Sequence, residues 1–433
     1  MLKSTLKNII VVVTVMALFM GFSSGCGKKK AKETALENEE ISFADVPSET
    51  GDASGNNEAN SPENSNDQNN LGGGNSSDPE NNSSTNNGVM EQEARNQMPI
   101  GAPIKVKALY LTGWVVGNPS RVEHYINLAK TTEINSYVID IKDDDGYVGY
   151  ESQIPEVREL GAWKYKYDVD KVLKAFHDND IYIIGRLVCF KDPVLSTKRP
   201  ELAVKHVNGG LWRDNFDLTW LDPYNKDSWP YLIEIAREAV NRGFDEIQFD
   251  YVRFPNEGNK KAMKFMDTDQ KKYEAINEFL AYAKKELPGV IISADVFGII
   301  CESPEDTEDI GQYLELIGKD IDYISPMVYP SHYALGQTVN NVVFPKPDLE
   351  PYGVVYNSLV KAVDRISKVT DYKAKIRPYI QDFTASWLRA GNYQKYGAEQ
   401  VRQQIQAVYD AGLDEWIVWD AENTYSEDAF LKE

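Results

Sequence analysis

From residue 104 onward, short apolar runs alternate with longer amphipathic stretches. The runs are short enough for single β-strands and lie at 106–112, 136–141, 181–189, 246–250, 290–296, 323–328, 376–381 and 415–419. Helical patterns lie between them at 121–131, 169–179, 229–242, 268–286, 310–317, 356–369 and 397–411. Eight strands separated by helices over about 330 residues predict an α/β fold, a (β/α)₈ TIM barrel. A doubly wound sheet, the competitor, would carry a Gly-rich phosphate loop after the first strand, and Thr-Gly-Trp-Val at 112–115 is not one.

Residues 1–26 have the pattern of a bacterial lipoprotein signal peptide. Lys3 and Lys7 precede an apolar run at 9–22, and small residues then lead to Cys26. The run is shorter than the roughly 20 residues that a transmembrane helix needs. We therefore expect a lipid anchor on Cys26 that holds the protein at the extracellular face of the bacterial membrane. Ser23 stands where lipoproteins usually carry an aliphatic residue, so an ordinary secretory signal, which would leave the protein secreted, is the alternative.

Residues 27–100 are predicted to form a disordered tether. Asn, Ser, Glu, Asp and Gly dominate this segment, which has almost no apolar side chains to bury. Residues 31–100 contain fourteen acidic residues against Lys32 and Arg95. A flexible chain of about 70 residues has a root-mean-square reach of roughly 45 Å, which would let an anchored domain search nearby wall material.

Residues 101–433 are long enough to bury a large core and are expected to form one domain. The chain has a formal net charge of −21, and this part is acidic as well, which disfavours nucleic acid as a partner. Cys189 and Cys301 imply no disulfide framework. The histidines occur singly, and the familiar zinc-hydrolase and serine-hydrolase motifs do not occur, so we predict no metal and no cofactor.

Several predicted strands end in polar residues. Burying a polar group costs free energy unless it forms hydrogen bonds or ion pairs, so such residues at the ends of buried strands indicate a functional or structural role. The fourth strand ends at Asp250, followed closely by Arg253, and the fifth carries Asp295. Asp140 ends the second strand, and Arg186 interrupts the apolar run of the third. In a barrel these ends meet at the C-terminal face, where active sites of this fold lie.

Two carboxyl groups on either side of a scissile bond, one protonated and one ionised, are what glycoside hydrolysis generally requires. Asp250 and Asp295 end neighbouring parallel strands and are the candidate catalytic pair, although the sequence does not say which of them is protonated. An aspartate at a strand end can instead cap the next helix or turn. The candidates for substrate binding are Asp140, Arg186, Arg253, Tyr329, His332, Gln381 and Trp419.

The sequence also resembles a bacterial glycoside hydrolase family, formerly known as a domain of unknown function, that is related to the amylase-like barrels. The motifs that carry the resemblance are Leu-Tyr-Leu-Thr-Gly-Trp (109–114), Val-Ile-Asp-Ile-Lys-Asp-Asp-Asp-Gly (138–146), Phe-Asp-Glu-Ile-Gln-Phe-Asp-Tyr-Val-Arg-Phe-Pro (244–255), Ile-Ser-Ala-Asp-Val-Phe-Gly (292–298), Asp-Tyr-Ile-Ser-Pro-Met-Val-Tyr-Pro-Ser-His-Tyr (322–333) and Arg-Pro-Tyr-Ile-Gln-Asp-Phe-Thr (377–384). The resemblance implies a (β/α)₈ hydrolase acting on glycans, with Asp250 in the position of the nucleophile. At the position of the general acid, Asp295 stands where the amylase-like barrels carry glutamate.

The sequence therefore predicts an extracellular, lipid-anchored glycosidase that acts on a polysaccharide or oligosaccharide through Asp250 and Asp295. A barrel that binds cell-wall polysaccharide without cleaving it is the alternative. A deacetylase acting on wall polymers is disfavoured because the usual Asp/His/His metal set is missing.

Overall fold

The computed structural model describes residues 104–432. The predicted signal peptide, the tether at 27–100 and the lipid-anchor residue Cys26 lie outside these residues. Among the residues described, no helix combines the length and the apolar character that a membrane crossing requires.

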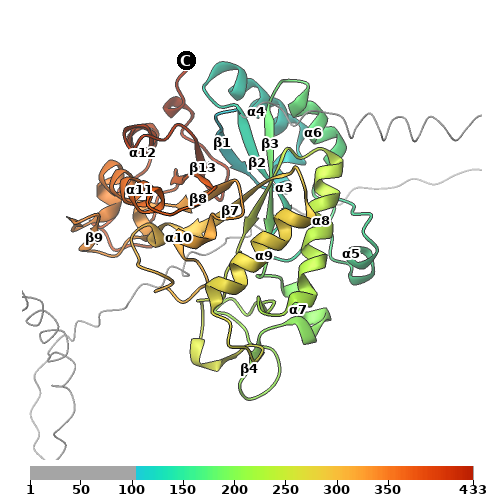
Figure 1. Cartoon of the computed structure of the whole chain (residues 1–433). Coiled ribbons are helices and arrows are strands. Elements are labelled where there is room, and N and C mark those ends of the chain that lie inside the picture. The colour runs from blue at the N-terminus through green and yellow to red at the C-terminus, as the bar shows by residue number, and fades with distance from the viewer. Residues whose placement is uncertain (1–103, 433) are drawn as a thin grey trace, which may run out of the picture. The chain divides into compact units, whose positions relative to one another are not determined.

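Eight parallel β-strands form a closed barrel (Figure 1). We call each of them a stave, and the seventh stave consists of two short strands. In chain order they are β1 (Lys107–Leu111), β2 (Ser136–Lys142), β3 (Tyr182–Val188), β5 (Glu246–Asp250), β7 (Ile291–Phe297), β8 (Tyr323–Met327), β11 with β12 (Lys375–Ile376 and Tyr379–Gln381) and β13 (Trp416–Trp419). Each stave pairs with its neighbours in the chain, and β13 closes the ring by pairing with β1 from Lys107↔Trp416 to Leu109↔Val418. The (β/α)₈ barrel predicted from the sequence is confirmed.

The seventh stave is broken where a continuous run, 376–381, was predicted. Pro378 lacks the N–H that would continue the ladder, so β11 ends at Ile376 and β12 begins at Tyr379. Its carbonyl still accepts a hydrogen bond from the backbone N–H of Ile417 at 2.9 Å, which keeps the broken stave attached to β13.

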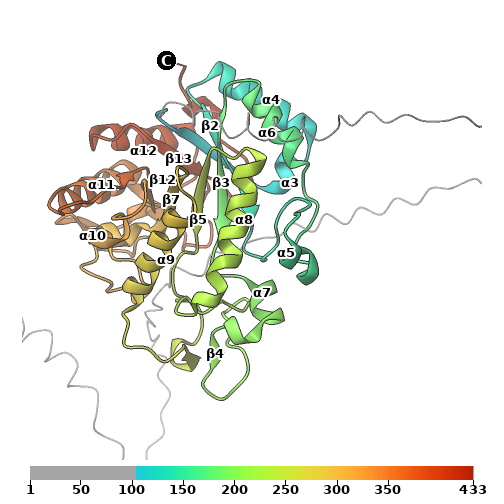
Figure 2. The same cartoon turned by 45° about the vertical axis from the view of Figure 1, so that its right-hand side comes forward.

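Helices surround the barrel, and α8 and α9 lie side by side on its outside (Figures 1 and 2). The helices are α3 (Gly113–Val116), α4 (Pro119–Thr131), α5 (Pro155–Leu160), α6 (Val169–His177), α7 (Pro193–Lys198), α8 (Trp229–Arg242), α9 (Lys272–Glu286), α10 (Leu314–Ile317), α11 (Pro351–Ser367) and α12 (Ala398–Asp410). Two short antiparallel pairs lie in the loops: β4 (Lys205–His206) pairs with β6 (Met263–Lys264), and β9 (Gln337–Val339) forms a hairpin with β10 (Val342–Phe344).

The helix predicted over 310–317 is much shorter than its sequence pattern indicated. Asp306 accepts hydrogen bonds from the backbone N–H groups of Ile310 and Gly311, and Gly311 adopts a left-handed φ of 85°. This loop geometry is incompatible with a helix through these positions, so α10 begins only at Leu314.

The interior of the barrel becomes polar at both ends. Near the start of the staves, Arg377 forms an ion pair with Glu246, and both side chains are almost completely buried. In the next layer, Tyr379 donates a hydrogen bond of 2.6 Å to Gln248. Side chains therefore fill the lower part of the barrel, and the groups available for chemistry lie at the carboxyl ends of the staves.

Candidate active site

Four ionisable side chains from consecutive staves converge at the C-terminal end of the barrel. Strand alternation directs Asp140 of β2, Arg186 of β3, Asp250 of β5 and Asp295 of β7 toward the interior. The register places Asp140 directly beside Arg186. A bulge in β2 follows Asp140, as is common next to active sites.

Arg186 links two of the carboxylates. Its Nη1 lies 2.8 Å from Oδ1 of Asp140, and its Nη2 lies 2.6 Å from Oδ2 of Asp250. All three side chains are buried. Burial raises the pKa of Asp140, an effect that the positive charge of Arg186 opposes. The guanidinium thus holds both carboxylates in fixed positions and compensates their charge.

Two aromatic rings pack against this ion-pair network. Tyr110 donates a hydrogen bond of 2.7 Å to Oδ2 of Asp140, and its ring stacks on Trp419 with 3.9 Å between centroids. The Arg186 guanidinium lies 5.5 Å from the Tyr110 ring and 5.4 Å from the Trp419 ring. These contacts restrict Arg186 to one position, which in turn orients Asp250.

The backbone turns sharply immediately after Asp250. Tyr251 has a φ of 47°, which is a strained value for a residue with a side chain. Its backbone N–H donates a hydrogen bond of 2.6 Å to Oδ1 of Asp250. The second oxygen of Asp250 is therefore fixed as well, and the strained turn is part of what fixes it.

Asp295 has a contrasting environment. It is only 2% exposed, and its Oδ1 accepts no hydrogen bond from any residue in 104–432. Burial raises the pKa of Asp295 well above its ordinary value, and the negative charge of Asp250 raises it further. Asp295 is therefore protonated under conditions in which an exposed aspartate is ionised.

Tyr329, from the loop after β8, is within electrostatic range of this carboxyl pair. Burial raises its pKa, and the charges of Asp295 and Asp250 contribute further to the rise. Its ring packs in the same apolar cluster as Tyr110, Tyr379 and Trp419. The phenol is thus neutral and close to both carboxyl groups.

Three other predicted substrate-binding residues contact neighbouring side chains or loops. Arg253 does not pair with Asp250 but forms an ion pair of 2.6 Å with Glu257, four residues away. Its guanidinium lies 4.6 Å from the Phe297 ring. Gln381 is completely buried and holds the loop after β8, because its Oε1 accepts a hydrogen bond of 2.8 Å from Ser331 Oγ. His332 contacts Ser331 Oγ through Nδ1 at 2.9 Å.

The contribution of Tyr110 was not predicted from the sequence. Its position two residues after Ala108 puts it on the interior face of β1, and that alternation was the available signal. Among residues 104–432, no group of three or more His, Cys, Asp or Glu side chains is arranged to hold a metal ion.

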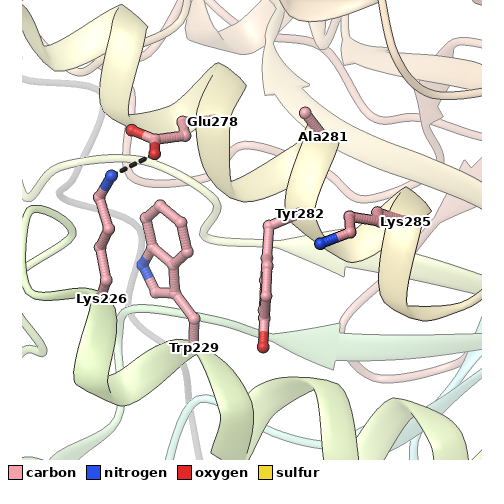
Figure 3. Close-up of a pocket in the computed structure, with 6 residues that line it drawn as sticks. All are labelled: Lys226, Trp229, Glu278, Ala281, Tyr282 and Lys285. Atoms are coloured by element: carbon pink, nitrogen blue, oxygen red, sulfur yellow. Dashed lines mark hydrogen bonds and ion pairs between the residues drawn. The ribbon is translucent and has the colours of Figure 1, made fainter.

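An open groove of about 400 Å³ lies outside the barrel between α8 and α9 (Figure 3). It is lined by Lys226, Trp229, Glu278, Ala281, Tyr282 and Lys285. Its one carboxylate, Glu278, forms an ion pair with Lys226, which lowers the pKa of Glu278. A single ionised carboxylate cannot supply both roles of glycoside hydrolysis, whereas the strand ends hold two carboxyl groups in different environments.

The fold is a (β/α)₈ barrel with two carboxyl groups on neighbouring strands at its C-terminal end. The family model described as "Putative glycosyl hydrolase domain" matches residues 108–425, and the chain belongs to this family. Among curated proteins, none matches the sequence.

Several solved structures are similar to this chain. A hypothetical protein from Ruminiclostridium thermocellum is 74% identical over 44% of this chain and 99% of its own length, with a TM-score of 0.43. The glycoside hydrolase domain of PgaB (BpsB) from Bordetella bronchiseptica is 13% identical over 76% of this chain and 100% of its own length, with a TM-score of 0.55, and shares the fold. The spore cortex-lytic enzyme SleL of Bacillus megaterium is 15% identical over 76% of this chain and 74% of its own length, with a TM-score of 0.43. The predicted glycosidase barrel is therefore confirmed at the level of family and fold.

Proposed function

We propose that the protein is an extracellular, lipid-anchored glycoside hydrolase in which Asp295 is the general acid and Asp250 is the nucleophile or stabilising carboxylate. The observation that supports this proposal most directly is the contrast between the two carboxyls. Asp250 is paired with Arg186, whereas Asp295 is buried without a hydrogen-bond partner for Oδ1 and has a raised pKa. Environments that separate the protonation states of two neighbouring carboxyls allow one to act as acid and the other as base or nucleophile.

The reaction follows from these protonation states. Asp295 donates its proton to the glycosidic oxygen, and the bond to the anomeric carbon breaks with its electron pair going to the departing sugar. The carboxylate of Asp250 stabilises the positive charge that develops at the anomeric carbon. Water then adds to that carbon and returns a proton to Asp295, which completes the cycle. Arg186 keeps Asp250 in position throughout, and Tyr329 and Trp419 shape the site around the cleaved bond.

The test uses residues 101–433 with a glycan panel and measures released reducing ends. We expect Asp250→Asn and Asp295→Asn each to lower turnover by at least a hundredfold. Asp295→Asn should leave thermal unfolding nearly unchanged, whereas Asp250→Asn should lower the unfolding temperature because it removes a charge paired with Arg186, so its folding is checked by circular dichroism. Asp192→Asn is unsuitable as a control because Asp192 forms a buried ion pair with Lys142. Asp245→Asn is the matched control, since Asp245 precedes β5 and contacts His177 outside the barrel mouth. Full turnover in Asp250→Asn would contradict the assignment.

A second candidate function is glycan binding without cleavage. It is favoured by the low exposure of the carboxyls, 7% for Asp250 and 2% for Asp295. This function predicts that the domain binds a glycan, that it releases no reducing ends, and that Asp295→Asn leaves the glycan affinity unchanged. The same panel therefore distinguishes the two functions.

The lipid anchor and the extracellular location form a separate part of the proposal, supported by the sequence pattern of residues 1–26. In cells that produce the full chain, the protein should fractionate with membranes, and Cys26→Ala should release it. Membrane association that persists in Cys26→Ala would rule out this anchor.

A further inference from the structure

Two loops at the barrel mouth bring four rings together. The loop after β8 supplies Tyr329 and His332, and the loop after β12 supplies Phe383 and Trp387. We call these four residues the aromatic wall. None of them other than Tyr329 and His332 was considered as a functional residue from the sequence.

The rings of the aromatic wall form a continuous series from the interior to the surface. Tyr329 lies 5.5 Å from Phe383 between centroids, and Phe383 lies 5.8 Å from Trp387 in a stacked arrangement with 25° between planes. His332 is 5.3 Å from Tyr329 and 6.3 Å from Trp387. Tyr329 is buried, whereas Trp387 is 41% exposed, so the series ends in solvent.

The inner end of the aromatic wall adjoins the carboxyl pair. Tyr329 and Phe383 pack in the same cluster as Trp419, whose ring lies against Arg186. Tyr329 is also close enough to Asp295 and Asp250 for both charges to act on its phenol. A glycan with one unit at the carboxyls can therefore extend along the aromatic wall.

Gln381 fixes the two loops relative to each other. Its side-chain oxygen accepts hydrogen bonds from the Ser331 backbone N–H at 3.2 Å and from Ser331 Oγ at 2.8 Å. Its amide nitrogen donates to the Phe383 carbonyl at 2.9 Å and to Asp348 at 3.2 Å. The buried amide connects the loop that carries His332 with the loop that carries Phe383, so the wall is preorganised for a ligand.

The aromatic wall is also uncharged. Burial lowers the pKa of His332 to about 4, so its imidazole is neutral at neutral pH. Neutral aromatic faces stack on the apolar faces of sugar rings, and a neutral imidazole can exchange hydrogen bonds with hydroxyl groups. This chemistry suits a neutral sugar unit better than a charged group.

We propose that the aromatic wall binds a sugar unit beyond the one at Asp250 and Asp295, and that the substrate is consequently an oligomer or polymer of several units. This inference rests on the proposed function. It specifies a second subsite whose outermost contact is Trp387.

The test measures affinity in the Asp250→Asn background, which prevents cleavage. The probes are oligosaccharide ladders of glucose, galactose and N-acetylglucosamine, from monomer to hexamer, titrated by calorimetry. We expect the affinity for at least one ladder to rise with chain length. Trp387→Ala should weaken binding of the longer oligomers about tenfold, which corresponds to about 1.4 kcal/mol, and should not change monomer binding. Trp387→Phe should retain most of the affinity.

Tyr352→Ala is the matched control, because Tyr352 is a similarly exposed aromatic residue on α11, where it stacks on Tyr356. It should leave every affinity unchanged. The proposal is overturned if no ladder shows length-dependent binding, or if the length dependence survives Trp387→Ala.

Turnover separates this inference from the proposed function. If the unmutated domain binds a ladder through Trp387 but releases no reducing ends, the hydrolytic assignment fails and the aromatic wall stands. If the domain cleaves a ladder and Trp387→Ala leaves its length preference intact, hydrolysis stands and the aromatic wall is wrong.

Discussion

Arg186 and Asp250 meet through two nitrogen atoms on one oxygen, with Nε at 2.8 Å and Nη2 at 2.6 Å from Oδ2. The same guanidinium holds Asp140 at 2.8 Å. One buried cation therefore serves two buried carboxylates, and its loss would leave both without their compensating charge. This arrangement makes Arg186 a structural determinant of the barrel mouth as well as a positioning residue for Asp250.

We predict that Arg186→Met destabilises the domain by roughly 3–5 kcal/mol, the usual cost of removing one partner from a buried ion pair. Arg186→Lys should cost less because it keeps the charge, although it loses the planar geometry that reaches both carboxylates. Urea denaturation followed by circular dichroism measures the change. Arg199→Met is the control, since Arg199 forms an exposed pair with Glu156 and should change stability by less than about 1 kcal/mol. Equal losses in Arg186→Met and Arg199→Met would refute this account.

The pH dependence of activity should report the raised pKa of Asp295. A general acid must be protonated, so kcat/KM falls as the pH rises through the pKa of that acid. Because burial and the charge of Asp250 raise this pKa, the alkaline decline should begin well above about 3.9, the ordinary value for aspartate. Hydrolysis rates across a pH series test the prediction. An alkaline decline centred near the ordinary value would show that Asp295 is not the acid.

His332 should make the stability of the domain depend on pH in the acidic range. Burial lowers its pKa to about 4 in the folded state, against about 6.5 in the unfolded chain. Between these values the unfolded state binds more protons, so stability falls as the pH decreases from about 6.5 to about 4. The contribution is roughly 3 kcal/mol at about 1.4 kcal/mol per pKa unit.

The measurement compares unfolding free energies of the unmutated domain and His332→Asn at several pH values. The difference between the two proteins should change across this window and stay constant above it. His206→Asn provides the control; His206 ends the short strand β4, and its ring accepts a hydrogen bond from the Asn208 backbone N–H. A difference that does not vary with pH would contradict the predicted role of His332.

Gly298 should tolerate no side chain. A Cβ atom at this position would lie 2.3 Å from the carbonyl oxygen of Met327, at the point where β7 and β8 run side by side. Gly298→Ala must separate these strand ends, which carry Asp295 and lead to Tyr329, and it should cost about 1–3 kcal/mol and lower kcat/KM. At Gly397, the nearest atom to such a Cβ is 3.9 Å away, so Gly397→Ala meets no clash. It should cost at most about 1 kcal/mol, because Gly397 is the N-cap of α12 and alanine is a poorer N-cap than glycine, and it should leave kcat/KM unchanged. Comparable losses at both glycines would rule out crowding as the cause.

The regular parts of this fold could be predicted because each stave corresponds to a short apolar run in the sequence, with turn residues on either side. Asp140, Arg186, Asp250 and Asp295 could be expected to converge, since parallel strands in a barrel all end at the same face. Their ion pairs could not be predicted in the same way. Arg253 follows the Asp250 strand closely in sequence, yet the backbone turn at Tyr251 carries it toward Glu257.

Other features depend on long-range contacts that a local pattern does not contain. Phe383 and His332 come together only because Gln381 joins loops that are fifty positions apart in sequence, Ser331 to Gln381. Gln381 itself was predicted to bind substrate, and its predicted role as a ligand stays untested, while its hydrogen bonds serve the two loops. Tyr110 similarly acquires its partner, Asp140, from a neighbouring stave.

The side chains that fill the lower half of the barrel determine how a substrate can enter and how products can leave. The interior below the carboxyls is closed by the side chains of Arg377, Glu246, Tyr379 and Gln248. The barrel is therefore open only at its C-terminal end. In the proposed hydrolysis, both products would therefore leave through the same opening by which the intact glycan enters. A product bound along the aromatic wall would lie between the deeper product and solvent, so the proposal implies that it leaves first.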